Sequence, residues 1–211
     1  MPVPVLLFVE GEHDVIFFRE WLRSTSALAV KTVKALEAEH QLRKMFVGVL
    51  IVDCGGIPRI YKIISKLMRT IIVNLPIPFP RLVAVGDSDR FSVEEVCQYL
   101  ALYVTSPCKD HCLSFSITSS ASSVSLAEFT KNRLLGIPCH LVPVNLETQI
   151  YDKTPSSIKQ QVPSQCTIDS KLAVATRLMG YPELNSLIEA SVDWLAAENW
   201  IGNLRNDIVI P

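Results

Sequence analysis

The 211-residue sequence carries little charge, and it has neither a CxxC cysteine pair nor a long apolar run. Charged residues make up 19% of the chain and the formal net charge is -1, which excludes attachment to nucleic acid through bulk charge. No apolar run reaches the roughly 18 residues that a membrane span needs. The apolar N-terminal segment lacks a basic lead and ends at Glu10 rather than at a cleavage site. We therefore expect a cytoplasmic protein with no membrane partner.

The six cysteines predict no disulfide framework, because none of them forms a CxxC pair. One denser group of side chains could supply four zinc ligands, namely Cys108, Cys112, Cys139 and His140. Zinc sites usually show tighter paired spacing, so ordinary loop cysteines are the alternative. The sequence leaves this choice open.

Apolar residues make up 49% of the chain, which is typical of a folded globule. Apolar runs of strand length alternate with segments of helical periodicity. The expected strands are 3–9, 47–53 and 81–86, and the expected helices are 14–23, 31–44, 58–70 and 92–104. Such alternation predicts an α/β, Rossmann-like fold with a mainly parallel sheet and helices on both faces.

The second half of the chain has a weaker pattern. Further strands are expected at 112–118 and 139–147, around an irregular serine-rich connection at 114–125. A polar loop at 153–168 precedes two expected helices, 170–179 and 183–198. We therefore divide the chain into an α/β domain, 1–150, and a small C-terminal loop and helical extension, 151–211, packed on it.

Acidic residues follow the expected strands. The strand ends carry Glu10, Asp53, Asp87 with Asp89, and Glu147. In open α/β sheets the ligand site lies outside the carboxyl ends of the strands, so these side chains should face one rim. Singly, each acid could form a turn or cap a helix. Two converging acidic turns repel each other and favour a shared Mg²⁺ or Mn²⁺, which prefer oxygen ligands.

Two of these stretches resemble a known family. FVEGEHDVIFF, 8–18, and LVAVGDSDRF, 82–91, are similar to the two signature motifs of the Toprim domain, found in topoisomerases, primases and several nucleases. The resemblance implies a Toprim-like fold, with Glu10 as acid/base or metal ligand and Asp87 and Asp89 as magnesium ligands. It also implies that Gly11 and Asp14 support the site.

Later residues resemble the overcoming-lysogenization-defect nucleases within this family. Gly55-Gly56 after the second expected strand and LETQI, 146–150, are similar to motifs of that group. The resemblance implies that Gly55 and Gly56 support the site and that Glu147 is a further metal ligand.

Basic residues near the acidic rim are candidates for phosphate contacts. Arg90 directly follows the DxD acids and is a candidate catalytic residue at the scissile phosphate. Four further cations share one face of the helix expected at 58–70, namely Arg59, Lys62, Lys66 and Arg69. They predict contacts with a nucleic-acid backbone, and a solvated basic face is the alternative interpretation.

The combined pattern predicts a Mg²⁺-dependent nuclease that cleaves phosphodiesters in DNA or RNA. We see no room for the tyrosine-bearing domain of topoisomerases, and no GxxxxGK[ST] motif for ATP. A non-catalytic subunit that binds nucleic acid or a partner through the same rim is one alternative. A phosphatase with Asp87 as nucleophile is a second alternative. A partner protein or a homo-oligomer is compatible with each.

Overall fold

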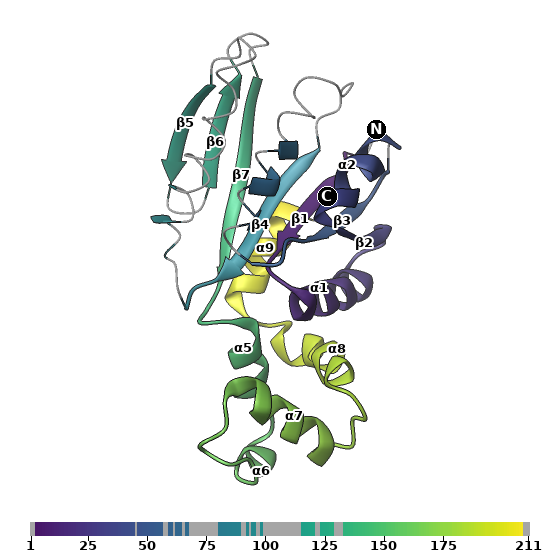
Figure 1. The fold of residues 1–211 in the computed structure, drawn as a ribbon, viewed down its shortest axis with the longest axis vertical. Coiled ribbons are helices and arrows are strands. Elements are labelled where there is room, and N and C mark those ends of the chain that lie inside the picture. Colours follow the sequence, from purple (N-terminus) through teal and green to yellow (C-terminus); the bar gives the residue numbers. More distant parts are fainter. Residues whose placement is uncertain are drawn as a thin grey trace.

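The computed structural model describes residues 3–44, 46–56, 59–60, 62–64, 66–67, 80–89, 92, 94–95, 98, 115–120, 123–128 and 133–208. Within these ranges, seven strands form one sheet in the order β2-β3-β1-β4-β7-β6-β5 (Figure 1). Five of them are parallel: β1 (Val5–Val9), β2 (Val30–Lys34), β3 (Val49–Asp53), β4 (Arg81–Asp87) and β7 (Arg133–Val142). The antiparallel strands β5 (Phe115–Ser120) and β6 (Ser123–Glu128) extend the β7 side.

Helices cover the parallel strands. The first half of the chain contributes α1 (Glu12–Thr25) and α2 (Ala35–Arg43), and residues 59, 60, 62–64, 66 and 67 are also helical. The second half contributes α5 (Leu146–Lys153), α6 (Ser156–Lys159), α7 (Ile168–Leu178), α8 (Leu184–Leu195) and α9 (Asn199–Ile208). The predicted α/β, Rossmann-like class with a mainly parallel sheet is confirmed. No helix in the described ranges combines the length and the apolar character that crossing a membrane would take.

The sheet separates two apolar cores. Every residue of β1 is buried, as expected for a central parallel strand, and alternate side chains point to opposite faces. Leu6 and Phe8 pack on one face with residues of α2 and with Ile60, Ile64 and Leu67. Leu7 and Val9 pack on the other face with α1 and with α5, α7, α8 and α9. The C-terminal helices therefore share a core with the first strand and helix.

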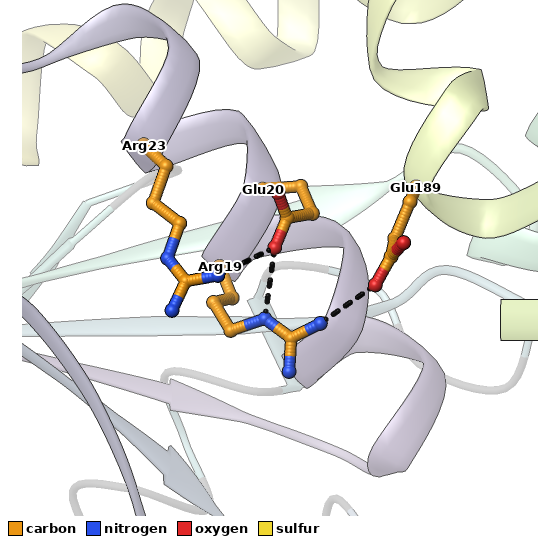
Figure 2. Close-up of polar contacts among 4 residues, drawn as sticks. All are labelled: Arg19, Glu20, Arg23 and Glu189. Atoms are coloured by element: carbon orange, nitrogen blue, oxygen red, sulfur yellow. Dashed lines mark hydrogen bonds and ion pairs between the residues drawn. The ribbon is translucent and has the colours of Figure 1, made fainter. Parts of the chain in front are cut away.

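Helix α8 also contacts α1 through surface charges. Arg19 donates through Nη2 to Glu189 at 2.8 Å, and through Nε to Glu20 at 3.0 Å (Figure 2). Glu20 also accepts from Arg23 at 2.9 Å. Since pairs this exposed typically contribute about 0–1 kcal/mol, the apolar contacts provide most of the stabilisation between the two helices.

Segment 31–44 was wrongly predicted as one helix. It comprises β2, an edge strand paired with β3 alone, followed by α2. Among the five residues of β2 only Val33 is buried, because an edge strand with one covered face can leave its remaining side chains in solvent. The polar residues Lys31, Thr32 and Lys34 of the predicted helix belong to this exposed edge, whereas the rest of the segment is helical in α2.

The expected elements of the second half are corrected at several boundaries. The serine-rich connection predicted at 114–125 contains β5 and the start of β6, which pair in register from Phe115↔Glu128 to Ser120↔Ser123. The hydrogen bonds between strands use backbone N–H and C=O groups, which serine also carries. The serine-rich composition therefore did not exclude strands. The strand predicted at 139–147 ends at Val142. The predicted loop 153–168 contains α6, the last predicted helix, 183–198, corresponds to α8, and α9 beyond it was not predicted.

A pair of glycine substitutions tests this backbone. Gly48, before β3, has φ +135°, and a Cβ there would lie 2.2 Å from the Ala29 carbonyl oxygen. Gly48→Ala should therefore destabilise the protein by about 1–3 kcal/mol or more. Gly202, exposed within α9, has open space around it, so Gly202→Ala should stabilise the helix by about 0.5–1 kcal/mol. Urea unfolding should show these opposite signs, and equal effects would contradict the assigned conformations.

Candidate acidic metal site

An open pocket of about 350 Å³ lies at the carboxyl ends of the parallel strands. Glu10 follows β1 and Asp87 ends β4, and these two strands are neighbours in the sheet. The pocket is lined by Glu10, Gly11, Glu12, His13, Asp14, Gly56, Asp87 and Glu147. Thus six residues selected from the sequence, all but Glu12 and His13, lie around one pocket.

Glu10 is held by the two loops that flank it. Its Oε1 accepts a hydrogen bond of 2.6 Å from the Asp87 backbone N–H. Its carbonyl oxygen accepts from the Gly56 N–H at 2.7 Å. Gly56 has φ +116°, a conformation that favours glycine. The glycine pair after β3 therefore fixes the backbone that carries Glu10.

Asp14 lies in the first turn of α1 and is only 9% exposed. Its Oδ2 accepts from the Gly11 N–H at 3.0 Å, which satisfies one backbone donor at the helix start. Burial and the nearby charges of Glu147 and Glu10 nevertheless raise the pKa of Asp14 to about 7. Asp14 therefore both closes the helix end and adds a carboxyl group to the pocket.

Asp87 has the more strongly shifted carboxyl group. Burial, followed by the negative charges of Asp14, Glu10 and the other nearby acids, raises its pKa to about 8. At neutral pH such a group stays largely protonated unless a cation compensates its charge. The five acidic residues that line the pocket fit a divalent cation with oxygen ligands. The donor set thus fits the magnesium that the sequence motifs imply.

His13 was not selected from the sequence, although it lies between two of the acids. Its Nδ1 is 2.7 Å from Glu147 Oε1, and this contact raises the pKa of His13 and lowers the pKa of Glu147. Glu147 was expected at a strand end but belongs to the first turn of α5, which Asn145 caps by accepting from the Thr148 N–H at 2.8 Å. The sequence signal that could have identified His13 is its position at the start of α1, between Glu12 and Asp14.

Other predicted rim acids lie outside the pocket lining. Asp89 is exposed, and its backbone N–H donates to the Val144 carbonyl at 2.8 Å. Asp53 pairs with Lys34 and accepts from the Gly55 N–H at 3.1 Å, so it closes the turn after β3. The charge of Asp89 still contributes to the raised pKa of Asp87.

Comparison of the chain with protein-family models, with curated proteins and with solved structures gave no match. The functional argument therefore depends on the pocket and its surroundings. After the Gly55-Gly56 turn, Arg59, Lys62 and Lys66 are exposed. Three apolar residues of the same helical segment are buried, namely Ile60, Ile64 and Leu67. The remaining predicted cations, Arg69 and Arg90, lie outside the described residues.

The cysteine and histidine pair of the possible zinc group is separated by the sheet. Cys139 is buried in the core on the α2 side. His140, its neighbour in β7, bonds through Nε2 to Asp207 of α9 at 2.8 Å. Since consecutive strand residues point to opposite faces, these two side chains do not share an ion. Cys108 and Cys112 lie outside the described residues.

Proposed function

We propose that the chain is a divalent-metal-dependent nuclease that uses Mg²⁺ or Mn²⁺ to cleave phosphodiester bonds in DNA or RNA. The observation that carries the proposal is the convergence of five acidic residues, Glu10, Glu12, Asp14, Asp87 and Glu147, around one pocket. A purely structural role would not require acidic residues to cluster at a place where burial and mutual repulsion raise their pKa values. The similarity of residues 8–18 and 82–91 to Toprim motifs supports the same chemistry. We place this activity in the cytoplasm.

In this proposal Glu10, Asp87 and Glu147 hold the ion, with Asp89 nearby, and Glu10 also acts as acid or base. A bound divalent ion would supply neutralisation of the phosphoryl oxygens and a nucleophilic water. The Asp87 N–H orients Glu10 through its hydrogen bond of 2.6 Å, so one Glu10 oxygen stays at a fixed place. Asp14 supports the helix end beside it.

The exposed cations would hold the polyanion outside the acidic pocket. Arg59, Lys62 and Lys66 lie on the segment that follows the Gly55-Gly56 turn, and Gly56 itself lines the pocket. An acidic pocket repels phosphate until its charge is compensated, so nearby cations supply the first attraction. Contacts of this kind weaken as the salt concentration rises.

Cleavage assays with Asp87→Asn and Glu10→Gln test the proposal. The wild-type chain should cleave single- or double-stranded DNA or RNA in Mg²⁺ or Mn²⁺, and EDTA should abolish cleavage. Loss of an outer hydrogen-bonding partner of a metal typically costs about 10- to 100-fold, so loss of a ligand should lower the rate by at least about 100-fold. Asp193→Asn, at an exposed position of α8, serves as the matched control and should leave the rate unchanged.

Three results would contradict the nuclease. Cleavage that persists in both variants would remove the acidic pocket from the chemistry. Nucleic-acid binding with no metal binding by calorimetry would favour a non-catalytic subunit. Hydrolysis of a small phosphate monoester, without cleavage of any polynucleotide, would favour the phosphatase with Asp87 as nucleophile.

A further inference from the structure

We propose a second cation site, suited to a transition metal, formed by His13, Glu147 and Asp169. Each residue offers one ligand atom, and the three atoms lie within 4.8 Å of one another. The residues come from the first turns of three helices, α1, α5 and α7, and α5 and α7 lie beyond the carboxyl ends of the parallel strands (Figure 1). Nothing in the sequence patterns selected His13 or Asp169 for metal binding.

The spacing requires only a small adjustment to hold an ion. Zinc bonds of about 2.0–2.2 Å to nitrogen and oxygen place neighbouring ligand atoms roughly 3–3.5 Å apart. His13 Nδ1 and Glu147 Oε1 are now 2.7 Å apart, so they would separate slightly as an ion replaced the shared proton. Asp169, the most exposed of the three, would move inward.

The Asp169 carboxylate has no competing partner among the residues that the structure describes. Asp169 lies in the first turn of α7, where a carboxylate could simply favour the helix dipole. The capping role is already filled, because Thr167 Oγ1 accepts from the Ser170 N–H at 3.3 Å. The charge of Asp169 acts instead on His13, as its contribution to the raised pKa of the imidazole shows. The two carboxylates thus flank one imidazole.

Helix packing holds the cluster in place. Leu172 of α7 and Ile150 of α5 are fully buried in the same core as residues of α1. Lys171, two residues after Asp169, lies 5.1 Å from the ring centroid of Tyr151 on α5. Such cation–π contacts contribute about 0.5–1 kcal/mol at exposed sites. The three helices that carry the candidate ligands are therefore held by a shared core, and α5 and α7 are also linked by the Lys171–Tyr151 contact.

The ligand set differs from that of the acidic pocket. One imidazole nitrogen with two carboxylate oxygens suits Zn²⁺, Mn²⁺ or Co²⁺, whereas Mg²⁺ prefers oxygen ligands alone. Asp169 is not among the residues that line the acidic pocket, whereas His13 and Glu147 are. Glu147 would then face both sites. This inference does not depend on the nuclease activity.

Titration of the full chain with Zn²⁺ by calorimetry and with Co²⁺ by visible absorption tests the site. His13→Gln and Asp169→Asn should each weaken Zn²⁺ binding at least about 10-fold and remove the Co²⁺ absorption. The controls His40→Gln and Asp193→Asn, both at exposed positions, should bind like the wild type. Thermal unfolding in EDTA checks that each variant is folded, and Asp169 is exposed enough for its replacement to leave the fold intact.

Asp87→Asn separates this site from the acidic pocket. Asp87→Asn should abolish Mg²⁺ binding and preserve Zn²⁺ binding. Asp169→Asn should weaken Zn²⁺ binding and preserve Mg²⁺ binding. Zn²⁺ binding that is unchanged in both His13→Gln and Asp169→Asn would overturn the proposal. Zn²⁺ binding lost in Asp87→Asn but kept in Asp169→Asn would also overturn it, because the ion would then occupy the acidic pocket.

Discussion

Raising the pH from about 5 to about 9 in EDTA is expected to destabilise the protein by several kcal/mol. Folding raises the pKa of Asp87 from 3.8 to about 8 and that of Asp14 from 3.8 to about 7, chiefly through burial. Each pKa unit corresponds to about 1.4 kcal/mol, so two such groups give an effect of this order. Urea unfolding at intervals of one pH unit would measure it.

The sign follows from the number of protons bound in each state. Above about pH 4 the unfolded chain releases the two aspartate protons, whereas the folded chain keeps them until about pH 7 and 8. The unfolded state therefore binds fewer protons in this window, and stability falls as the pH rises. His13 adds to the loss, because its raised pKa gives stability that disappears as the pH passes through its folded value. The lowered pKa of Glu147 also contributes to stability, and this contribution is lost at acid pH, as the pH falls through its folded pKa.

Magnesium and Asp87→Asn should each flatten this profile. A cation that binds only the folded state stabilises it and compensates the carboxylates, so Mg²⁺ should restore most of the stability lost at pH 8 to 9. Asp87→Asn removes the ionisation itself and should be at least as stable as the wild type at that pH. Its loss of cleavage would then reflect lost chemistry rather than unfolding. A flat profile for the wild type in EDTA would contradict the assigned environment of Asp87.

Phe17→Ala is expected to destabilise the protein by about 3–5 kcal/mol. Phe17 is fully buried in the core between α1 and the C-terminal helices. Its ring lies 5.3 Å from that of Phe18 in an edge-to-face arrangement, and 6.1 Å from that of Trp200. Removing the ring leaves a cavity at this junction. Denaturant unfolding measures the loss, and hydrogen exchange should show weaker protection of α8 and α9.

Leu36→Ala is the matched control, because Leu36 is a large apolar residue that is 83% exposed on α2. It should change the free energy of unfolding by less than about 0.5 kcal/mol. Similar losses for Phe17→Ala and Leu36→Ala would contradict the assignment of the core to the α1 face.

The first half of the fold was largely predictable because its strands lie deep in the sheet. The expected strands 3–9, 47–53 and 81–86 correspond closely to β1, β3 and β4, whose continuous apolar runs match burial on both faces. Strand β2 escaped detection since an edge position releases its side chains from that requirement. The expected strand 112–118 overlaps β5 at residues 115–118, but its pairing with β6 was not predicted, because backbone hydrogen bonds between strands leave no apolar pattern in a serine-rich sequence.

The candidate site was predictable where an acid directly follows a buried strand. Glu10 and Asp87 meet this condition, and adjacent parallel strands bring them together. Asp89 comes two residues later, and the turn after β4 places it outside the pocket lining. His13 and Asp169 come close to each other through the packing of α1 against α5 and of α5 against α7, which local sequence patterns do not encode.

The long sequence separations within the pocket have a consequence for protein synthesis. Glu10 and Asp87 are 77 positions apart, and the His13–Glu147 contact spans 134. Contacts that distant form late, because the chain must first close a large loop. A nascent chain on the ribosome therefore displays the first acidic motif long before its partners emerge. The growing polypeptide cannot assemble the complete pocket until α5 has been translated, which delays any reaction there until most of the sheet exists.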